Sequence, residues 1–317
     1  MKIGFIGLGN VGGKLAGSLL RNGFDLTVRD LNQEISLSFL DNGAKWGESP
    51  KQIAETVELV ITCLPNPAAS ASVMEADDGV LAGISSGKIW VEMSTTDEEE
   101  VKRLGAKVKA MGGEALDCPV SGGCHRAATG NISIFIGGER SSFEKILPVM
   151  KVLGRRILHT GSLGSASVLK VMTNYLATAN LVTLCEALTT AKKAGMDLST
   201  TYEAIRISSG NSFVHETESQ VILNGSRDIN FTMDLVLKDI SLFQAIAERV
   251  GVPLEVSPLL IDIFKDGEER YGSREWSPNI VRRLEEACDT QVLASGFPGE
   301  MVDNEPEVSG SEVVARV

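Results

Sequence analysis

Two polar side chains, Lys170 and Asn174, interrupt an apolar stretch of the chain that runs from Gly164 to Gly195. In a helix, residues four positions apart lie one above the other on the same face. A lysine among apolar neighbours loses hydration, which lowers its pKa and suits it to proton transfer near neutral pH. The alternative is a lysine whose ammonium group reaches solvent over an apolar surface, beside a solvent-facing asparagine. The spacing alone leaves both interpretations open.

An upstream loop combines a serine with paired glycines, as Ser121-Gly122-Gly123. It follows a predicted strand that ends at Asp117-Cys118 and is stopped by Pro119. Paired glycines let backbone N–H groups and a hydroxyl converge on one anion, and a substrate carboxylate is a good candidate for it. The alternative is an ordinary glycine-rich turn.

A second glycine-rich loop lies near the start of the chain, between a predicted strand at 2–7 and a helix that ends at Gly23. The strand DLTVRD follows and ends at Asp30. This order is the dinucleotide-binding fingerprint, in which the glycines allow a tight turn, close approach of pyrophosphate and close helix–strand packing. The helix N-terminus supplies N–H groups for the phosphates. The predicted cofactor-binding residues of the loop are Gly7, Leu8, Gly9, Asn10, Val11 and Gly12.

Asp30 predicts which dinucleotide binds. A carboxylate at this position accepts hydrogen bonds from ribose hydroxyls and repels a 2′-phosphate. Leu31 follows it, so no arginine directly after Asp30 receives that phosphate, and strand alternation turns Arg29 to the other side. The sequence therefore favours NAD over NADP.

Two further loops follow predicted strands at 57–64 and 88–94, the first at Pro65-Asn66-Pro67 and the second at Ser94-Thr95-Thr96. Loops at the carboxyl ends of strands line the ligand crevice in open α/β sheets. Each polar residue there could equally be a turn residue or a helix cap. The candidate contacts beside the nicotinamide are Leu64, Pro65, Asn66 and Thr96.

The elements that must position these residues predict two domains and a tail. Helices and strands alternate over residues 1–163, including a helix at 32–42, which predicts an α/β Rossmann domain with a mostly parallel sheet. Residues 164–288 read as successive helices without strands, and 289–317 as an irregular acidic tail, either disordered or laid over a neighbouring surface.

The long helix that joins the two domains is predicted from Gly164 to the stop at Gly195, about 45 Å at 1.5 Å per residue. Apolar residues lie on more than one side of it, which predicts burial between layers and an interface between copies of the chain, as a homodimer or homotetramer. These residues are Leu169, Met172, Leu176, Leu181, Leu184 and Leu188.

Composition excludes several kinds of partner. The formal net charge is −12, so the chain lacks the net basic face that binding to nucleic acid needs. No apolar run of about 20 residues is free of polar residues, and no secretory signal opens the chain. We therefore expect no nucleic acid, no membrane and a cytoplasmic location. The five cysteines form no CxxC pair and the three histidines no ligand-spaced pair, so no metal site is expected.

Four separated motifs carry a family resemblance. They are GFIGLGNVG at 4–12, DCPVSGG at 117–123, GSASVLKVMTN at 164–174 and LVLKDISL at 235–242. In this order, over roughly residues 1–290, they resemble the β-hydroxyacid dehydrogenase family, which includes 3-hydroxyisobutyrate dehydrogenase, tartronate semialdehyde reductase and short relatives of 6-phosphogluconate dehydrogenase.

The resemblance implies an NAD-dependent oxidoreductase that transfers a hydride between nicotinamide and C3 of a small 3-hydroxy acid, or its semialdehyde or keto form. Lys170 would be the general acid in reduction and the base in the reverse direction. Asn174 would hold the substrate's hydroxyl or carboxylate, and Ser121, Gly122 and Gly123 would bind the carboxylate. The other implied residues are Phe231 in the pocket, Lys238 toward the cofactor, Asp239 holding its helix in place, and Asn66 and Thr96 beside the nicotinamide.

Two departures from the family bear on the substrate. His125 and Arg126 stand where the commoner relatives have small or acidic residues, and the acidic tail is longer than the usual ending. A cation there could accept a second negative group on the substrate; alternatively, both side chains face solvent.

Two other functions are open to this chain. One is an imine reductase on the same fold, and the other is a non-catalytic dinucleotide-binding sensor or adaptor. Imine-reducing relatives replace the catalytic lysine, so the presence of Lys170 with Asn174 favours the dehydrogenase.

Overall fold

The computed structural model describes residues 1–316 and divides the chain into two compact units. The first unit comprises Met1–Lys170 together with the chain from Asp303 onward, and the second comprises Val171–Val302. Helix α8 (Ser165–Lys193) begins in the first unit and continues into the second. The unit boundary thus lies inside the long helix rather than before it, because the first turn of α8 contacts the sheet domain.

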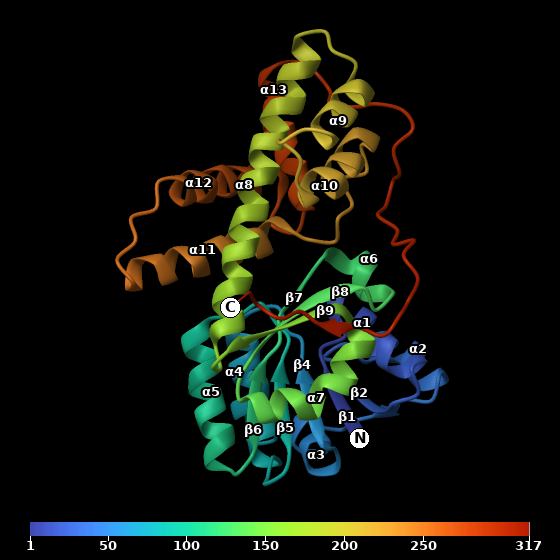
Figure 1. Cartoon of the computed structure of the whole chain (residues 1–317), viewed down its shortest axis with the longest axis vertical. Coiled ribbons are helices and arrows are strands. Elements are labelled where there is room, and N and C mark those ends of the chain that lie inside the picture. The colour runs from blue at the N-terminus through green and yellow to red at the C-terminus, as the bar shows by residue number, and fades with distance from the viewer. Residues whose placement is uncertain (317) are drawn as a thin grey trace. The chain divides into compact units, whose positions relative to one another are not determined.

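Ten strands within residues 1–316 form one sheet in the first unit, in the order β10-β9-β8-β6-β5-β4-β1-β2-β3, with β7 paired to β8 (Figure 1). Neighbouring strands are parallel except where β8 meets β6 and β7. The mostly parallel sheet predicted from the sequence is confirmed. The strands are β1 (Lys2–Ile6), β2 (Asp25–Arg29), β3 (Lys45–Trp46), β4 (Leu59–Thr62), β5 (Ile89–Glu92), β6 (Glu114–Asp117), β7 (Val120–Ser121), β8 (Ile132–Gly137), β9 (Gly154–Gly161) and β10 (Ser311–Glu312).

Helices cover both faces of this sheet, because its central strands are apolar on both sides. One apolar core lies under α1 (Asn10–Arg21) and α7 (Arg140–Leu153). The other lies under three further helices: α3 (Pro50–Thr56), α4 (Pro67–Glu75) and α5 (Glu98–Ala110). The remaining helical segments are η1 (Gln33–Ser36), α2 (Leu37–Asp41), η2 (Val80–Ala82) and α6 (Gly123–Ala128).

The region after β2 differs from its prediction. A single helix over 32–42 is wrong, because η1 is a tight 3₁₀ turn and only the short α2 is α-helical. Asn32 caps the start of this turn through the N–H of Glu34, and the Ser36 hydroxyl donates to the Gln33 carbonyl, a local hydrogen bond of the kind that competes with α-helical ones.

The second unit is helical, as predicted. No strand element lies in 171–302, although an isolated β-bridge joins Thr232 and Trp276. The apolar core of this unit includes several residues of α8. Helices α11 and α12 lie side by side (Figure 1). The helices are α9 (Leu198–Arg206), α10 (Phe213–Asn224), α11 (Met233–Arg249), α12 (Val256–Tyr271), η3 (Ser277–Val281) and α13 (Arg282–Ala287).

Glu218 on α10 predicts a pH-dependent stability. Burial raises the pKa of its carboxyl from 4.5 to about 8, and its Oε2 atom has no hydrogen-bond partner among residues 1–316. Because the folded protein holds this proton more tightly than the unfolded chain, the free energy of unfolding is highest below the unfolded pKa. It falls as the pH rises from the unfolded pKa to the folded pKa. We expect Glu218→Gln to match the wild type at about pH 4.5, and to exceed its unfolding free energy by up to about 5 kcal/mol at about pH 9, as urea denaturation measures it. An equal difference at both pH values would contradict this prediction.

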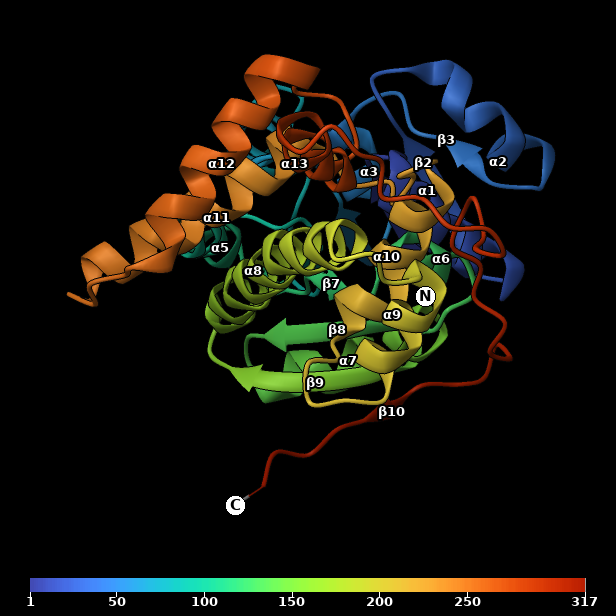
Figure 2. The ribbon, with the colours of Figure 1, turned by 90° about the horizontal axis from the view of Figure 1, so that it is seen from above.

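Residues 303–312 lie against the first unit. Strand β10 pairs in parallel with β9, with Ser311 opposite Arg156 and Glu312 opposite Ile157, as Figure 2 shows at the edge of the sheet. The sequence left two alternatives for the tail, disorder or packing over a neighbouring surface. The pairing of β10 with β9 shows that this segment packs over a surface. Within residues 1–316, no helix is both long and apolar enough to cross a membrane.

Candidate functional site

Three loops of the first unit emerge at one edge of the sheet. Gly7 directly follows β1, Leu64 follows β4, and Thr96 follows β5. Strands β5, β4 and β1 are adjacent and parallel, so their carboxyl ends lie at the same edge. The fold of the first unit therefore brings together the three loops that the sequence assigned to the cofactor.

The first glycine-rich loop is closely packed at two of its glycines and open at a third. Gly7 has φ +98°, and a Cβ there would lie 2.2 Å from the carbonyl oxygen of Cys63. A Cβ on Gly12 would lie 2.1 Å from the carbonyl oxygen of Gly7, so both positions require glycine. A Cβ on Gly9 would meet nothing within 4 Å, and Gly9 makes no side-chain cap for α1. The first-turn N–H groups of α1 thus border open space, which fits a pyrophosphate.

Asp30 holds this loop from the neighbouring strand. Its Oδ2 accepts a hydrogen bond of 2.7 Å from the N–H of Leu8, and its Oδ1 accepts one of 2.9 Å from the N–H of Asn32. An ionised carboxylate has about four acceptor sites, so it can also accept from ribose hydroxyls. Arg29 is engaged elsewhere, because its Nη1 donates to the carbonyls of Gly47 (2.9 Å) and Glu48 (2.6 Å).

A buried carboxylate that the sequence analysis missed links the next two loops. Glu92 is 0% exposed, and its Oε1 accepts hydrogen bonds from the N–H (2.9 Å) and the hydroxyl of Ser94. The Ser94 Oγ accepts in turn from the N–H of Leu64 at 2.7 Å. Burial raises the pKa of Glu92, although these hydrogen bonds act against the shift. Its position in the otherwise apolar strand IWVE was the available signal.

Glu92 therefore supplies a second testable prediction. Glu92→Leu leaves the two Ser94 donors buried without an acceptor, and we expect the dissociation constant for NADH to rise about tenfold as the Leu64 loop loosens. Glu92→Gln keeps an acceptor oxygen, and its affinity should stay within about threefold of the wild type. NADH fluorescence titration measures both. A dissociation constant for the Leu variant within about twofold of the wild-type value would contradict this role.

Asn66 and Thr96 have different surroundings. The Asn66 Oδ1 accepts a hydrogen bond of 2.9 Å from the N–H of Ala69, so this residue caps α4. Thr96 is 1% exposed, and its Oγ1 has no hydrogen-bond partner among residues 1–316. A buried hydroxyl without a partner is costly, which makes Thr96 the better candidate for a ligand contact.

The Ser121–Gly123 loop leads from β7 into α6. Gly122 has φ +130° and Gly123 φ +86°, conformations that favour glycine at both positions. Ser121 itself belongs to β7, where it pairs with Ser133 of β8. The backbone therefore requires glycine at both positions, a feature that an anion-binding loop and a glycine-rich turn share.

Asp117, four residues before this loop, caps the helix that carries Lys170. Its Oδ1 accepts a hydrogen bond from the N–H of Gly164 at 2.8 Å. Its Oδ2 accepts two from Ser167, at 2.7 Å from the N–H and 2.9 Å from the hydroxyl. Burial raises the Asp117 pKa, and these hydrogen bonds oppose the shift. The sequence marked Asp117 only as the end of a strand.

Lys170 follows this cap by one helical turn and is 7% exposed. Of the two interpretations of its spacing, this burial disfavours the one in which the ammonium group reaches solvent.

The second unit holds the other predicted site residues. The Asn174 Nδ2 donates to the Asp239 Oδ2, and the Lys238 Nζ lies 2.8 Å from the Asp239 Oδ1. Asp239 is 2% exposed, so one buried carboxylate orients both side chains. Phe231 packs against the helical core of this unit.

Within residues 1–316, no cluster of three or more His, Cys, Asp or Glu side chains could hold a metal ion. His215 Nε2 lies 2.9 Å from the Tyr202 carbonyl and His159 Nε2 lies 2.9 Å from the Gly138 carbonyl, so both imidazoles have backbone partners.

Comparisons with known proteins cover most of the chain. Residues 2–161 match the family model for the NAD binding domain of 6-phosphogluconate dehydrogenase. Residues 164–284 match the model described as NAD-binding of NADP-dependent 3-hydroxyisobutyrate dehydrogenase. Both matches end before the acidic tail.

Two curated relatives and one solved structure agree with these matches. The 2-(hydroxymethyl)glutarate dehydrogenase of Eubacterium barkeri is 31% identical over 92% of this chain and 97% of its own. The mitochondrial 3-hydroxyisobutyrate dehydrogenase of Rattus norvegicus is 28% identical over 83% of this chain and 81% of its own. The crystal structure of a 3-hydroxyisobutyrate dehydrogenase from Salmonella typhimurium superposes with a TM-score of 0.82 at 25% identity, over 89% of this chain and 99% of that one.

Proposed function

Because the chain belongs to the β-hydroxyacid dehydrogenase family, we propose that it transfers a hydride between nicotinamide and C3 of a small 3-hydroxy acid. One observation carries the proposal: the carboxylate of Asp117 caps the helix that presents the buried Lys170. It fixes the first turn of α8, which carries the buried Lys170, and it stands four residues before the Ser121–Gly123 loop. The residue that caps the lysine helix thus also lies close in sequence to the candidate anion loop.

In this mechanism Lys170 moves the hydroxyl proton. During reduction its ammonium group donates a proton to the carbonyl oxygen, and during oxidation its amine accepts the proton from the hydroxyl. When bound, the nicotinamide ring supplies or accepts the hydride. The cap by Asp117 fixes the helical turn that precedes Lys170, which limits the positions open to its side chain.

The other residues orient the substrate. Ser121, Gly122 and Gly123 bind its carboxylate through the serine hydroxyl and backbone N–H groups. Asn174 holds the substrate's hydroxyl or carboxylate and is itself oriented by Asp239. Phe231 supplies apolar surface to the pocket.

We assign the dinucleotide to the loop Gly7–Gly12, with Asp30 on the adenosine ribose, and we prefer NAD to NADP. Asp30 is a charged acceptor beside the loop, and Leu31, which is fully exposed, offers no cation for a 2′-phosphate. The nicotinamide side comprises Leu64, Pro65, Asn66, Thr96, Lys238 and Asp239.

The direct test is NADH formation from a panel of 3-hydroxy acids with methyl, hydroxymethyl, second-carboxylate or sulfonate substituents, using NAD and NADP in parallel. We expect turnover of at least one acid, with kcat/KM for NAD at least about tenfold above that for NADP. Absence of turnover on the whole panel in both directions, combined with tight NADH binding, would instead favour a sensor or adaptor.

The protein is proposed to act in the cytoplasm as a homodimer or homotetramer, without nucleic acid or membrane partners. Leu176 of α8 is 53% exposed, an apolar surface that a second copy can cover. Light scattering tests this assembly, and a monomeric mass would exclude it.

A further inference from the structure

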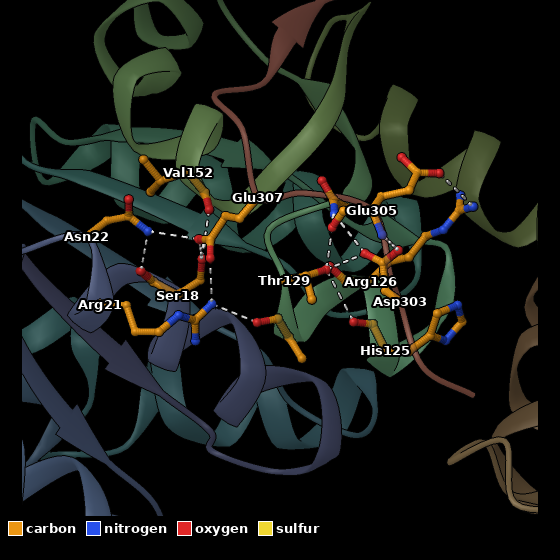
Figure 3. Close-up of polar contacts among 12 residues, drawn as sticks. Ser18, Arg21, Asn22, His125, Arg126, Thr129, Val152, Asp303, Glu305 and Glu307 are labelled. Carbon is orange, nitrogen blue, oxygen red and sulfur yellow. Dashed lines mark hydrogen bonds and ion pairs between the residues drawn. The ribbon is translucent and has the colours of Figure 1, made fainter. Parts of the chain in front are cut away.

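The segment from Asp303 to Glu312, which we call the strap, crosses the first unit and lies beyond the last residue that either family model matches. Figure 3 shows it passing α6 and α1, far from it in sequence. Its acidic side chains meet hydroxyl, amide and guanidinium groups at each step, so its path is fixed by specific contacts.

Asp303 makes the contacts at the end of α6. Its Oδ2 accepts hydrogen bonds from the Thr129 hydroxyl and from the Asn131 Nδ2, the latter at 2.7 Å (Figure 3). Its Oδ1 accepts a third, of 3.1 Å, from the N–H of Glu305. Burial raises the Asp303 pKa, but the hydrogen bonds outweigh it and hold the pKa below its usual value. Asp303 is therefore a charged acceptor at neutral pH.

The rest of the strap anchors it on either side of this point. The Glu307 Oε1 accepts a hydrogen bond of 3.1 Å from the Asn22 Nδ2, at the end of α1. The N–H of Gly310 donates to the Lys151 carbonyl at 2.8 Å, and Glu312 accepts from the Arg140 Nη2 at 3.0 Å. Asp303 thus belongs to a segment held by α1, α7 and β9.

Helix α6 needs such support because it has only six residues, too few to be stable alone. It begins at Gly123, inside the anion loop, and Thr129 is the residue that follows its last turn. Arg21 of α1 donates a 2.6 Å hydrogen bond to the Ala128 carbonyl from one side. Asp303 holds Thr129 and Asn131 from the strap, so movement of the strap is transmitted to the loop.

We propose that Asp303 is a positioning residue, which fixes α6 and through it the Ser121–Gly123 loop, and so sets the affinity for the substrate carboxylate. The inference rests on the proposed function for the ligand of this loop. It gives the long acidic tail a role in substrate binding without contact to substrate.

The test compares Asp303→Ala, Thr129→Val, the double variant and Asp303→Asn. We expect each single variant to raise KM for the 3-hydroxy acid about tenfold, with kcat and the NADH dissociation constant within about twofold of wild type. The double variant should be no worse than Asp303→Ala, since that variant already removes the contact with Thr129. Asp303→Asn keeps one acceptor oxygen and should recover most of the affinity.

Glu300→Ala is the matched control, because it removes an exposed acidic side chain three residues earlier. Its KM should equal that of the wild type. A substrate KM within about twofold of wild type in Asp303→Ala, or an equal rise in the NADH dissociation constant, would overturn the proposal.

Hydrogen–deuterium exchange separates this inference from the proposed function. Asp303→Ala should speed exchange in residues 122–131 at least about tenfold while exchange in α1 stays unchanged. If the wild type turns over none of the acids, the proposed function is wrong, and hydrogen exchange alone tests the role of Asp303. Unchanged protection of residues 122–131 in Asp303→Ala would then reject that role, and a loss of protection confined to them would support it.

Discussion

Replacing Lys170 with alanine is expected to lower kcat for the 3-hydroxy acid by about a thousandfold, the size typical of a lost general acid–base group. Lys170 is 7% exposed and follows the Asp117 cap by one turn, so no solvent-borne acid can readily take its place. NADH binding should persist, because the loop Gly7–Gly12 and Asp30 are independent of this side chain. Steady-state kinetics and fluorescence titration measure the two quantities separately.

Lys170→Arg is the matched control for this prediction. A guanidinium keeps the positive charge but stays protonated in proteins, so it cannot serve as the base in oxidation. Its kcat should also fall at least about a hundredfold. If either variant kept more than about a tenth of the wild-type kcat, proton transfer would have to be assigned to another group.

Exchanging the charge at the end of β2 should reverse the dinucleotide preference. In Asp30→Asn combined with Leu31→Arg, an amide replaces the repelling carboxylate and a guanidinium becomes available to a 2′-phosphate. The Asn side chain still offers an oxygen to the Leu8 N–H, so the loop keeps its contact. We expect the ratio of kcat/KM for NAD over NADP to fall by at least about a hundredfold.

Asp30→Ala is the informative comparison. It removes the repulsion and also the acceptor for Leu8, so catalytic efficiency with both dinucleotides should fall. A double variant that keeps the wild-type preference would contradict the assignment of Asp30 to the adenosine ribose.

The features that could be predicted from sequence are those set by local residues. The Gly7–Gly12 loop needs glycines because of contacts within one strand–turn–helix unit, and the spacing to Asp30 completes a short-range pattern. The long helix predicted from Gly164 likewise follows from a stretch of residues without a helix breaker, and in the structure α8 spans Ser165–Lys193. Where local side-chain hydrogen bonds compete with helix formation, as at Ser36, the prediction of one helix over 32–42 failed.

The supporting carboxylates could not be predicted, because each acts on residues far away in the chain. Asp117 caps a helix 50 residues later, and Asp303 binds Thr129 across 174 residues. Such pairs depend on how strands order in the sheet, which the sequence pattern leaves open. Glu92 could be noticed as a charged residue in an apolar strand. The sequence did not show that Glu92 would be linked, through Ser94, to the backbone of Leu64.

The Asn174–Asp239 pair illustrates a partial prediction. The family resemblance implied a role for both residues, and it assigned Asp239 to holding its helix in place. In the structure Asp239 accepts a hydrogen bond from Asn174 and contacts Lys238. Helical spacing alone does not reveal which neighbouring helix a side chain meets.

The most direct test of the central claim is to follow the transferred hydrogen itself. The active acid of the panel is deuterated at the carbon that bears the hydroxyl, and the NADH formed is examined by mass spectrometry and NMR. Direct transfer predicts one deuterium at C4 of the nicotinamide, together with a slower reaction of the labelled acid under single-turnover conditions. NADH without deuterium would contradict hydride transfer from C3.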